Sequence, residues 1–271
     1  MKLVTFTVQG RTRLGEVVGD TVYTMAWVDG MTSLIRRGIL PSRTWESFPL
    51  SSVTLEAPLR PGKVIGIGLN YAEHARETGK EAPAEPVVFG KNTTSVIGIN
   101  QPITWRTSES KQVDFEGELA VVIGKKAQRV AEADAFDYVF GYTIGNDVSA
   151  RDLQKEQWLR AKGMDTFCPL GPILVTKDEV PDPHALSIKT RVNDTLMQDG
   201  NTADMMQKIP ALIAYLSRYF TLEPGDVIMT GTPSGVGKAR KPPVFLHDGD
   251  VVEITISGLG TLTNPCREIA E

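Results

Sequence analysis

Short β-prone segments fill most of this sequence, and they do not alternate regularly with helical ones. Runs rich in valine, isoleucine and threonine recur between turns that contain glycine or proline. A parallel doubly wound sheet needs a helix between successive strands, so the pattern instead predicts an α+β fold with mixed sheets and a few packed helices. The expected strands lie at residues 3–8, 15–24, 53–55, 64–68, 86–91, 115–124, 139–147, 171–176, 186–193, 226–232 and 250–260.

Helical periodicity is clearest over residues 202–220, where apolar side chains form one continuous stripe. Residues 70–79 are expected to form a short helix. Asn70 is its expected N-cap, Glu73 stands at the capping-box position, and Gly79 ends it. Further short helices are expected at residues 31–37, 131–137 and 148–160.

The pattern changes character near residues 59–62, where Pro and Gly read as a junction. A polar stretch, residues 41–52, interrupts the β pattern before that point. We therefore expect a small β-rich N-terminal module over residues 1–58 and a larger domain over residues 59–271. A chain of 271 residues is long enough for one large domain with a small appendage.

Composition argues against several classes of partner. The net charge is −4 and no basic run occurs, so nucleic acid is not an expected partner. The N-terminus lacks the apolar core of a signal peptide, and no window approaches the roughly 18 apolar residues of a membrane span. The cysteines, Cys168 and Cys266, stand alone without C-x-x-C spacing. They are expected to be reduced thiols in a cytoplasmic protein.

Three carboxylates are candidate metal ligands. Strand alternation places Glu116 and Glu118 on one face, which Asp114 would share if the strand begins early. Acids at this spacing repel one another unless a cation is bound, and oxygen ligands suit magnesium, manganese or calcium. The alternative is a solvated strand face. Asp147 ends an apolar strand, where it is either a ligand or the N-cap of the helix expected after it.

His74 is a candidate general base. On a helix, Glu77 lies three residues further on and can accept a hydrogen bond from the imidazole. Such a pair can activate water, although it can equally be a surface contact of little energetic value. Lys162 lies in a Gly- and Pro-broken stretch, where its ammonium either stabilises an anion or is solvated. His184 and His247 are interpreted as structural.

Further polar groups follow the expected metal ligands. Arg151 and Gln154 come soon after Asp147 in the chain. The glycine-rich turn at residues 231–237 can present backbone N–H groups and the Thr232 hydroxyl to a carboxylate. This turn lacks the G-K-[ST] of a P-loop, and the chain has no complete dinucleotide fingerprint, so no nucleotide site is expected.

In their order and spacing, these segments resemble the fumarylacetoacetate hydrolase superfamily. The resemblance runs from about residue 61 to residue 265, and several of the matching segments are too long for a chance match. They are GLNYAEHARE (68–77), FGKNTTSVIG (89–98), VDFEGELAVVIG (113–124), GYTIGNDVSARDLQ (141–154), RAKGMDTFCPLGP (160–172), RVNDTLMQDGNTADM (191–205), LEPGDVIMTGTPSGVG (222–237) and DGDVVEITISGLGTLTNP (248–265).

The resemblance implies a mixed β-sandwich roll in the main domain and assembly as a homodimer. It also implies Mg²⁺ or Mn²⁺, with Ca²⁺ as a possible substitute in crystals. The ligands that it implies are Glu116, Glu118 and Asp147.

The resemblance further implies roles around that metal. His74 and Glu77 match the family's water-activating pair, on a segment that acts as a lid in relatives, and Lys162 matches the lysine that stabilises developing negative charge. The positions that match residues near the substrate's oxo and carboxylate groups are Lys91, Arg151, Gln154 and Thr232.

The reaction expected on this basis is hydrolysis of a carbon–carbon bond in a 2,4-dioxo acid. The substrate would be a small acylpyruvate-like oxo acid of aromatic catabolism, such as fumarylpyruvate or acetylpyruvate, cleaved through a metal-stabilised enolate. Such enolates are also intermediates in decarboxylation and tautomerisation. The first alternatives are therefore an oxaloacetate decarboxylase and a 2-hydroxyhepta-2,4-diene-1,7-dioate-type isomerase.

Two other functions remain open at this stage. One is a hydrolase of 2,4-didehydro-3-deoxy sugar acids. The other is a metal-binding domain without catalysis, which the presence of His74, Glu77 and Lys162 disfavours.

Overall fold

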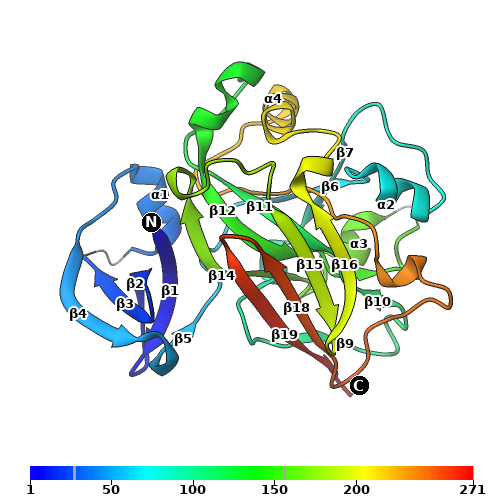
Figure 1. Ribbon diagram of the computed structural model, residues 1–271, viewed down its shortest axis with the longest axis horizontal. Helices are drawn as coiled ribbons and strands as arrows, with labels where there is room; N and C mark the ends of the chain where they lie inside the picture. The colour runs from blue at the N-terminus through cyan, green and yellow to red at the C-terminus, as the bar shows by residue number, and fades with distance from the viewer. Residues whose placement is uncertain (27–28, 156, 271) are drawn as a thin grey trace.

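The computed structural model describes residues 1–26, 29–155 and 157–270. Strands dominate it, and a few short helices pack around two large sheets (Figure 1). This confirms the predicted α+β class with mixed sheets. Within the described residues, no helix is long and apolar enough to span a membrane.

The larger sheet has twelve strands and runs through both parts of the chain. Neighbouring strands in this sheet are mostly antiparallel, but β17 (Val227–Met229) pairs in parallel with β6 (Val64–Gly68). Two short strands, β5 (Thr54–Leu55) and β8 (Val96–Ile97), pair with β1 and β14 beside the main path. The order along the path is β4 (Arg43–Pro49), β3 (Thr21–Met25), β2 (Arg11–Val18), β1 (Lys2–Val8), β14 (Cys168–Thr176), β12 (Val139–Asn146), β11 (Gly117–Ile123), β17 (Val227–Met229), β6 (Val64–Gly68) and β7 (Val87–Lys91).

A five-stranded sheet packs against the large one and lies in front of it in Figure 1. One face of β11, with Leu119 and Val121, shares a buried cluster with Ile254 of this second sheet. The opposite face of β11, with Ala120 and Val122, is buried in another cluster. The strand that carries the candidate ligands is thus buried on both sides. The second sheet consists of β16 (Thr195–Asn201), β15 (Ser187–Val192), β18 (Val251–Ile256), β19 (Gly260–Glu268) and β9 (Ile103–Trp105).

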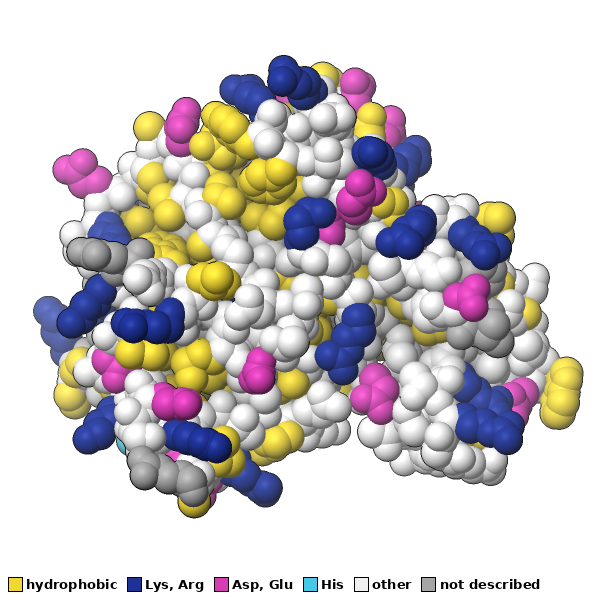
Figure 2. Space-filling model, turned by 180° about the vertical axis from the view of Figure 1, so that it is seen from behind, with side chains coloured by type: hydrophobic (Ala, Val, Ile, Leu, Met, Phe, Trp, Pro, Cys, Tyr) yellow, Lys and Arg dark blue, Asp and Glu magenta, His cyan; other side chains and the backbone are white. Residues whose placement is uncertain are grey.

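The N-terminal residues form a smaller lobe beside the main body (Figure 2). Helix α1 (Met31–Arg37) packs Leu34 and Ile35 into the cluster that also holds Ala120 of the main domain. Strand β1 pairs directly with β14, with Leu3 opposite Leu174. The lobe therefore extends the main sheet through backbone hydrogen bonds and a shared core.

Several expected elements differ from those observed. The segment 148–160 is not one helix: β13 (Ser149–Ala150) pairs with β10 (Val113–Asp114), and only α3 (Trp158–Lys162) is helical, residue 156 lying outside the described residues. The helix expected over 202–220 is shorter, α4 (Ile209–Tyr219), because proline is accepted in the first turn of a helix but not in its interior.

Other differences concern local geometry. Residues 131–137 were expected to be α-helical, but Glu132–Tyr138 form a 3₁₀ segment. The polar stretch 41–52 contains β4, an edge strand that the sequence pattern missed. Its alternation of exposed and half-buried residues gives little apolar signal.

Helix α2 (Ala72–Glu77) is anchored at both ends, although not in the predicted way at its start. Asn70 does not cap it. Its side chain instead donates to the carbonyls of Gln207 and Thr230 and accepts from the Gln207 N–H, which ties the helix entry to two distant loops. The predicted end at Gly79 is confirmed: Gly79 adopts φ of 70°, and Lys80 N–H donates to Ala75 in a Schellman arrangement.

The close approach of β12 to β14 gives a stability prediction. A methyl group added at Gly141 would overlap the carbonyl oxygen of Val175 on the neighbouring strand. We expect Gly141→Ala to lower the free energy of unfolding by about 1–3 kcal/mol or more, because backbone cannot yield as a side chain can. Gly90→Ala on β7 is the matched control, since the added methyl group would lie 4.0 Å from the carbonyl oxygen of Val64. Urea denaturation measures both, and equal midpoints would contradict the prediction.

Candidate metal centre and active site

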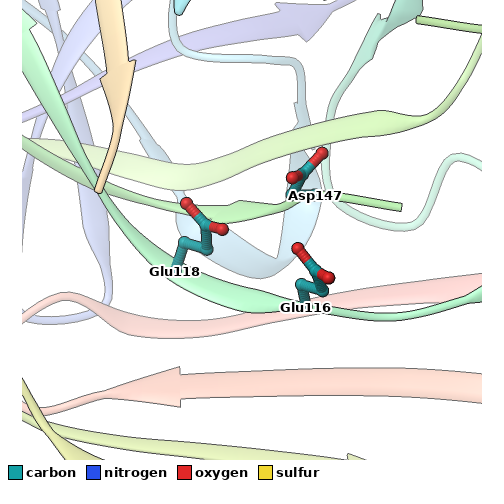
Figure 3. A group of neighbouring side chains, drawn as sticks. All are labelled: Glu116, Glu118 and Asp147. Carbon is teal, nitrogen blue, oxygen red and sulfur yellow. The ribbon is translucent and has the colours of Figure 1, made fainter. Parts of the chain in front are cut away.

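Two antiparallel strands bring the three carboxylates together. Glu118 lies on β11, Glu116 directly precedes it, and Asp147 directly follows β12. The pairing of Gly117 with Asn146, and the hydrogen bond from Asp147 N–H to the Glu116 carbonyl, align the strand ends. One oxygen from each carboxylate lies within 4.8 Å of the others, and all three side chains are buried (Figure 3).

This geometry decides between the interpretations that the sequence left open for these acids. The glutamates do not form a solvated strand face, since they are at most 5% exposed. Asp147 is not a helix cap, because the chain continues into strand β13.

Three cations from separate elements surround the carboxylates. Lys162, at the end of α3, places Nζ 2.9 Å from Glu116 Oε2 and 2.5 Å from Asp147 Oδ2. Lys91, at the end of β7, places Nζ 2.5 Å from Asp147 Oδ1. Arg151 reaches Glu116 Oε1 at 2.7 Å. Burial of an ion is costly unless it is paired, so these contacts are what allows the cluster to be buried.

The pKa shifts follow from the same contacts. Burial disfavours the charged forms of Lys162 and Arg151, but the neighbouring carboxylates outweigh it and raise the pKa of each. Burial also opposes ionisation of Glu116, yet the charges of Lys162 and Arg151 hold the pKa of Glu116 well below its usual value. Glu116 is therefore ionised in this environment.

Glu118 differs from the other two acids. Among the described residues it has no ion pair, and its Oε2 accepts only the N–H of Gly231, at 2.8 Å. Burial and the charges of Asp147 and Glu116 raise the pKa of Glu118 well above its usual value. A cation beside these oxygens would remove that repulsion. The all-oxygen donor set fits a hard divalent ion, held by Glu116, Glu118 and Asp147.

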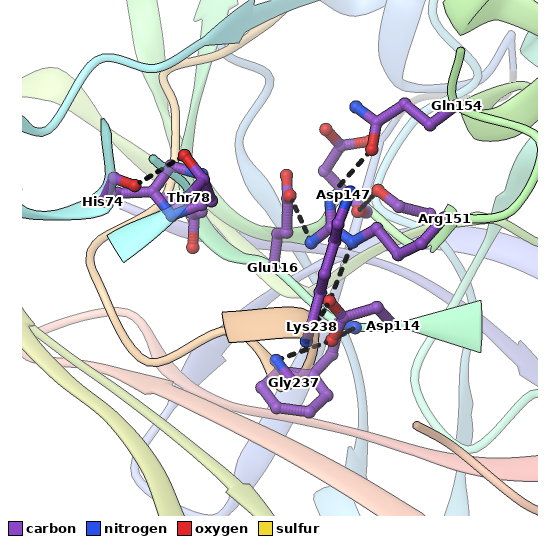
Figure 4. Close-up of polar contacts among 12 residues, drawn as sticks. His74, Thr78, Asp114, Glu116, Asp147, Arg151, Gln154, Gly237 and Lys238 are labelled. Atoms are coloured by element: carbon purple, nitrogen blue, oxygen red, sulfur yellow. Dashed lines mark hydrogen bonds and ion pairs between the residues drawn. The ribbon is translucent and has the colours of Figure 1, made fainter. Parts of the chain in front are cut away.

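Asp114 does not join the metal cluster, although strand alternation allowed it. Its Oδ2 accepts from Arg151 Nε at 2.8 Å, and its two oxygens accept the backbone N–H groups of Gly237 and Lys238 (Figure 4). Asp114 therefore orients Arg151, whose other nitrogens contact Glu116 and Gln154.

The N–H groups of the glycine-rich turn face carboxylates, as the sequence predicted, and these carboxylates belong to the protein itself. Gly231 donates to Glu118, and Gly235 donates to Glu77 at 2.8 Å. The N–H groups of Gly237 and Lys238 donate to Asp114. The turn thus holds three acids of the site in place.

His74 and Glu77 form the expected pair on α2. His74 Nδ1 lies 2.8 Å from Glu77 Oε1, while Glu77 Oε2 accepts from Gly235. Since Nδ1 is engaged, Nε2 is the nitrogen left to exchange a proton. His74 is 5% exposed and lines the same pocket as Glu116 and Glu118.

The remaining predicted residues take different positions. Gln154, Lys162 and Thr232 line the pocket, but Lys91 does not, since it contacts Asp147 from behind. The Thr232 hydroxyl donates to the Gly117 carbonyl and accepts from Gln198, so only its remaining lone pair can contact a substrate.

Several residues of the site were not found from the sequence. Gln198 on β16 binds both the Gly117 N–H and the Thr232 hydroxyl, and it joins the second sheet to the site. Lys80, Trp158 and Lys238 line the pocket. No motif marks them, because each reaches the pocket only through the packing of distant segments.

Comparison with known proteins agrees with this geometry. The family profile described as "Fumarylacetoacetate (FAA) hydrolase C-terminal" matches residues 63–267. The chain belongs to the fumarylacetoacetate hydrolase superfamily. It is therefore an enzyme of this superfamily, and the resemblance inferred from the sequence is confirmed.

Three relatives sharpen the comparison. The mitochondrial oxaloacetate tautomerase fahd2 of Xenopus laevis is 52% identical over 220 residues, which cover 79% of this chain and 69% of that protein. The oxaloacetate tautomerase YisK of Bacillus subtilis is 50% identical over 223 residues, covering 80% and 74%. The crystallised fumarylacetoacetate hydrolase of Exiguobacterium antarcticum has a TM-score of 0.89 at 39% identity and covers 99% of this chain and 100% of its own.

The metal assignment can be tested by binding. We expect Glu118→Gln to weaken Mn²⁺ binding at least about 100-fold, since loss even of outer partners of a ligand costs 10–100-fold. The amide oxygen can still accept from Gly231, so the fold should persist. Isothermal titration calorimetry measures the affinity, with the exposed Glu132→Gln as control.

The same variant gives an independent measurement without metal. Removing a buried charge that Glu116 and Asp147 repel should leave the metal-free protein at least as stable as the wild type. Unchanged Mn²⁺ affinity in a folded Glu118→Gln protein would contradict the assignment.

Proposed function

We propose that this enzyme interconverts the enol and keto forms of oxaloacetate or a closely related 2-oxo diacid. The carrying observation is that His74, with Nδ1 held by Glu77, lines the pocket whose floor carries Glu116 and Glu118. The tautomerases of Xenopus and Bacillus share about half of their aligned residues with this chain. Tautomerisation is thus better supported than the acylpyruvate hydrolysis expected from the sequence.

Proton transfer at carbon is the chemistry that His74 supplies. In the keto-to-enol direction, Nε2 takes a proton from C3 of the substrate, and solvent water supplies the proton that the 2-oxo oxygen gains. In the opposite direction the imidazolium returns the proton to C3, and the enol oxygen releases its proton to solvent water. Glu77 keeps the imidazole oriented and stabilises the charged ring.

The head of the substrate belongs at the carboxylate cluster. Mg²⁺ or Mn²⁺ held by Glu116, Glu118 and Asp147 supplies a Lewis acid for the carboxylate and oxo oxygens. Arg151 and Gln154 line the same pocket and offer polar contacts beside that head.

The hydrogen bonds of Lys162 support tautomerisation over hydrolysis. Its ammonium has three hydrogens, and three oxygens accept them: Glu116 Oε2, Asp147 Oδ2 and Ser149 Oγ. Lys162 therefore contributes charge to the site without a free N–H group for a new oxyanion. Hydrolysis that relied on Lys162 as the oxyanion donor would lack that donor here, whereas enolisation needs a base at C3 and a proton for the 2-oxo oxygen.

Other expectations remain predictions. Assembly as a homodimer, a cytoplasmic location and a place in aromatic catabolism follow from the family resemblance and from the sequence composition. Size-exclusion chromatography with light scattering measures the first of these directly.

His74 gives the sharpest test of the reaction. We expect His74→Asn to lower kcat for tautomerisation by about 10²–10⁴-fold, the usual contribution of a general base, while oxalate still binds. The decay of enol absorbance measures the rate, and calorimetry measures oxalate binding. His247→Asn, in an exposed turn, is the matched control. A wild-type rate in His74→Asn would remove the proposed base.

Metal removal tests the other half of the site. Dialysis against EDTA should abolish the enzyme-dependent rate, and Mg²⁺ or Mn²⁺ should restore it, because the substrate head would lose its Lewis acid. The measurement is the same absorbance decay, corrected for the rate in buffer alone. Activity that survives thorough chelation would contradict a metal-dependent reaction.

A substrate panel separates the competing reactions. Oxaloacetate, acetylpyruvate and fumarylpyruvate are incubated with the Mn²⁺-loaded enzyme, and products are identified by NMR. The proposal expects fast enol–keto exchange of oxaloacetate. Faster cleavage of an acylpyruvate to pyruvate and an acid would favour hydrolysis instead.

A further inference from the structure

Two lysines line the active-site pocket and have no counter-ion among the described residues. Lys80 follows α2, Lys238 follows the glycine-rich turn, and both side chains line the pocket that holds His74 and Glu116. Neither ammonium makes an ion pair or hydrogen bond with any residue in the described ranges 1–26, 29–155 and 157–270. Lys80 and Lys238 are far apart in the sequence, so it is the tertiary fold that places both positive charges at one pocket.

The other cations of the site are already neutralised. Lys162 contacts Glu116 and Asp147, and Arg151 contacts Glu116 and Asp114. Among the described residues that line the pocket, Lys80 and Lys238 are therefore the lysines left to pair with an anionic group beyond the carboxylate cluster.

Both lysines are exposed at the pocket, and neighbouring side chains set their environment. Lys80 Nζ lies 5.5 Å from the centroid of the Trp158 ring, which holds it over the pocket wall. Partial burial lowers the pKa of Lys238, and the charges of Arg151 and Lys80 lower it further, although Asp114 opposes them. An anion between the two ammonium groups would relieve their repulsion.

The positions in Figure 4 agree with a substrate bound lengthwise. Glu116 lies between His74 and Thr78 on one side and Lys238, Arg151 and Gln154 on the other. A small 2-oxo diacid with its head at the carboxylate cluster would extend its second carboxylate along this pocket, and its C3 lies between its two ends.

We propose that Lys80 and Lys238 bind the distal carboxylate of the substrate and make the enzyme selective for 2-oxo diacids over 2-oxo monoacids. This inference rests on the proposed function, since it takes the substrate head to lie at Glu116 and Glu118. The lysines are specificity-determining residues and transfer no proton.

Lys80 also connects recognition to the base. Its backbone N–H closes the C-terminal cap of α2 by donating to Ala75, and α2 carries His74. A carboxylate held by Lys80 therefore contacts the same short segment that presents the imidazole.

The test compares a diacid with a ligand that differs only in the distal charge. Oxaloacetate and its 4-methyl ester serve for kinetics. Malate and its 4-methyl ester serve for binding by calorimetry to the Mn²⁺-loaded protein. The variants are Lys80→Gln with Lys238→Gln, the conservative pair Lys80→Arg with Lys238→Arg, and the control Lys126→Gln, which lies beyond the opposite end of β11.

We expect the wild type and Lys126→Gln to favour the diacid over its ester by about tenfold or more, as two charge contacts at a partly exposed site would give. The double glutamine variant should lose that preference mainly through KM and Kd, so that the diacid and its ester are bound about equally. The arginine pair should keep it, and added salt should weaken it.

Two results would overturn the proposal. One is a wild type that binds malate no more tightly than its ester. The other is a double glutamine variant that keeps the wild-type ratio of affinities. If the wild type binds malate selectively but does not tautomerise oxaloacetate, the proposed reaction fails while the lysine assignment stands, because the binding ratio is measured without turnover.

Discussion

The burial of four carboxylates at the end of an apolar sheet is the constraint on which this site depends. Asp114, Glu116, Glu118 and Asp147 are each at most 5% exposed. Burial of an unpaired charge carries a large desolvation penalty, so the fold must place counter-ions beside these carboxylates. Lys91 comes from the end of β7, Arg151 from the turn after β13, and Lys162 from the end of α3. Within the described part of the chain, Glu118 has one backbone hydrogen bond and no ion pair, and this makes the cluster receptive to a cation.

The rigidity of the site comes from the strands beneath it. Both faces of β11 are buried, and its register with β12 is regular from Gly117 to Val122, so the positions of the acids are set by backbone geometry. The turn 231–238 adds hydrogen bonds to three carboxylates. The general base is positioned in another way, because His74 lies on a short helix and not on a strand. That helix is held by Asn70 and by the cap at Gly79.

Much of the chemistry was visible in the sequence, whereas the supporting contacts were not. The spacing of Glu116 and Glu118, and of His74 and Glu77, follows from local periodicity, which a strand or a helix imposes wherever it lies. Local preference misled where long-range contacts compete with it. Asn70 looked like a helix cap but hydrogen-bonds to loops more than a hundred residues away, and the segment after Asp147 pairs as a strand with β10.

The sequence by itself determined the α+β class, the identity of the acids that can hold a metal, and the pairing of His74 with Glu77, because each depends on neighbours within a few residues. The tertiary structure decided that Asp114 orients Arg151, that the N–H groups of the glycine-rich turn bind the protein's own carboxylates, and that Lys80 and Lys238 line one pocket. These outcomes depend on which remote segments come into contact. That is settled by the burial of the whole core and has no local signature in the chain.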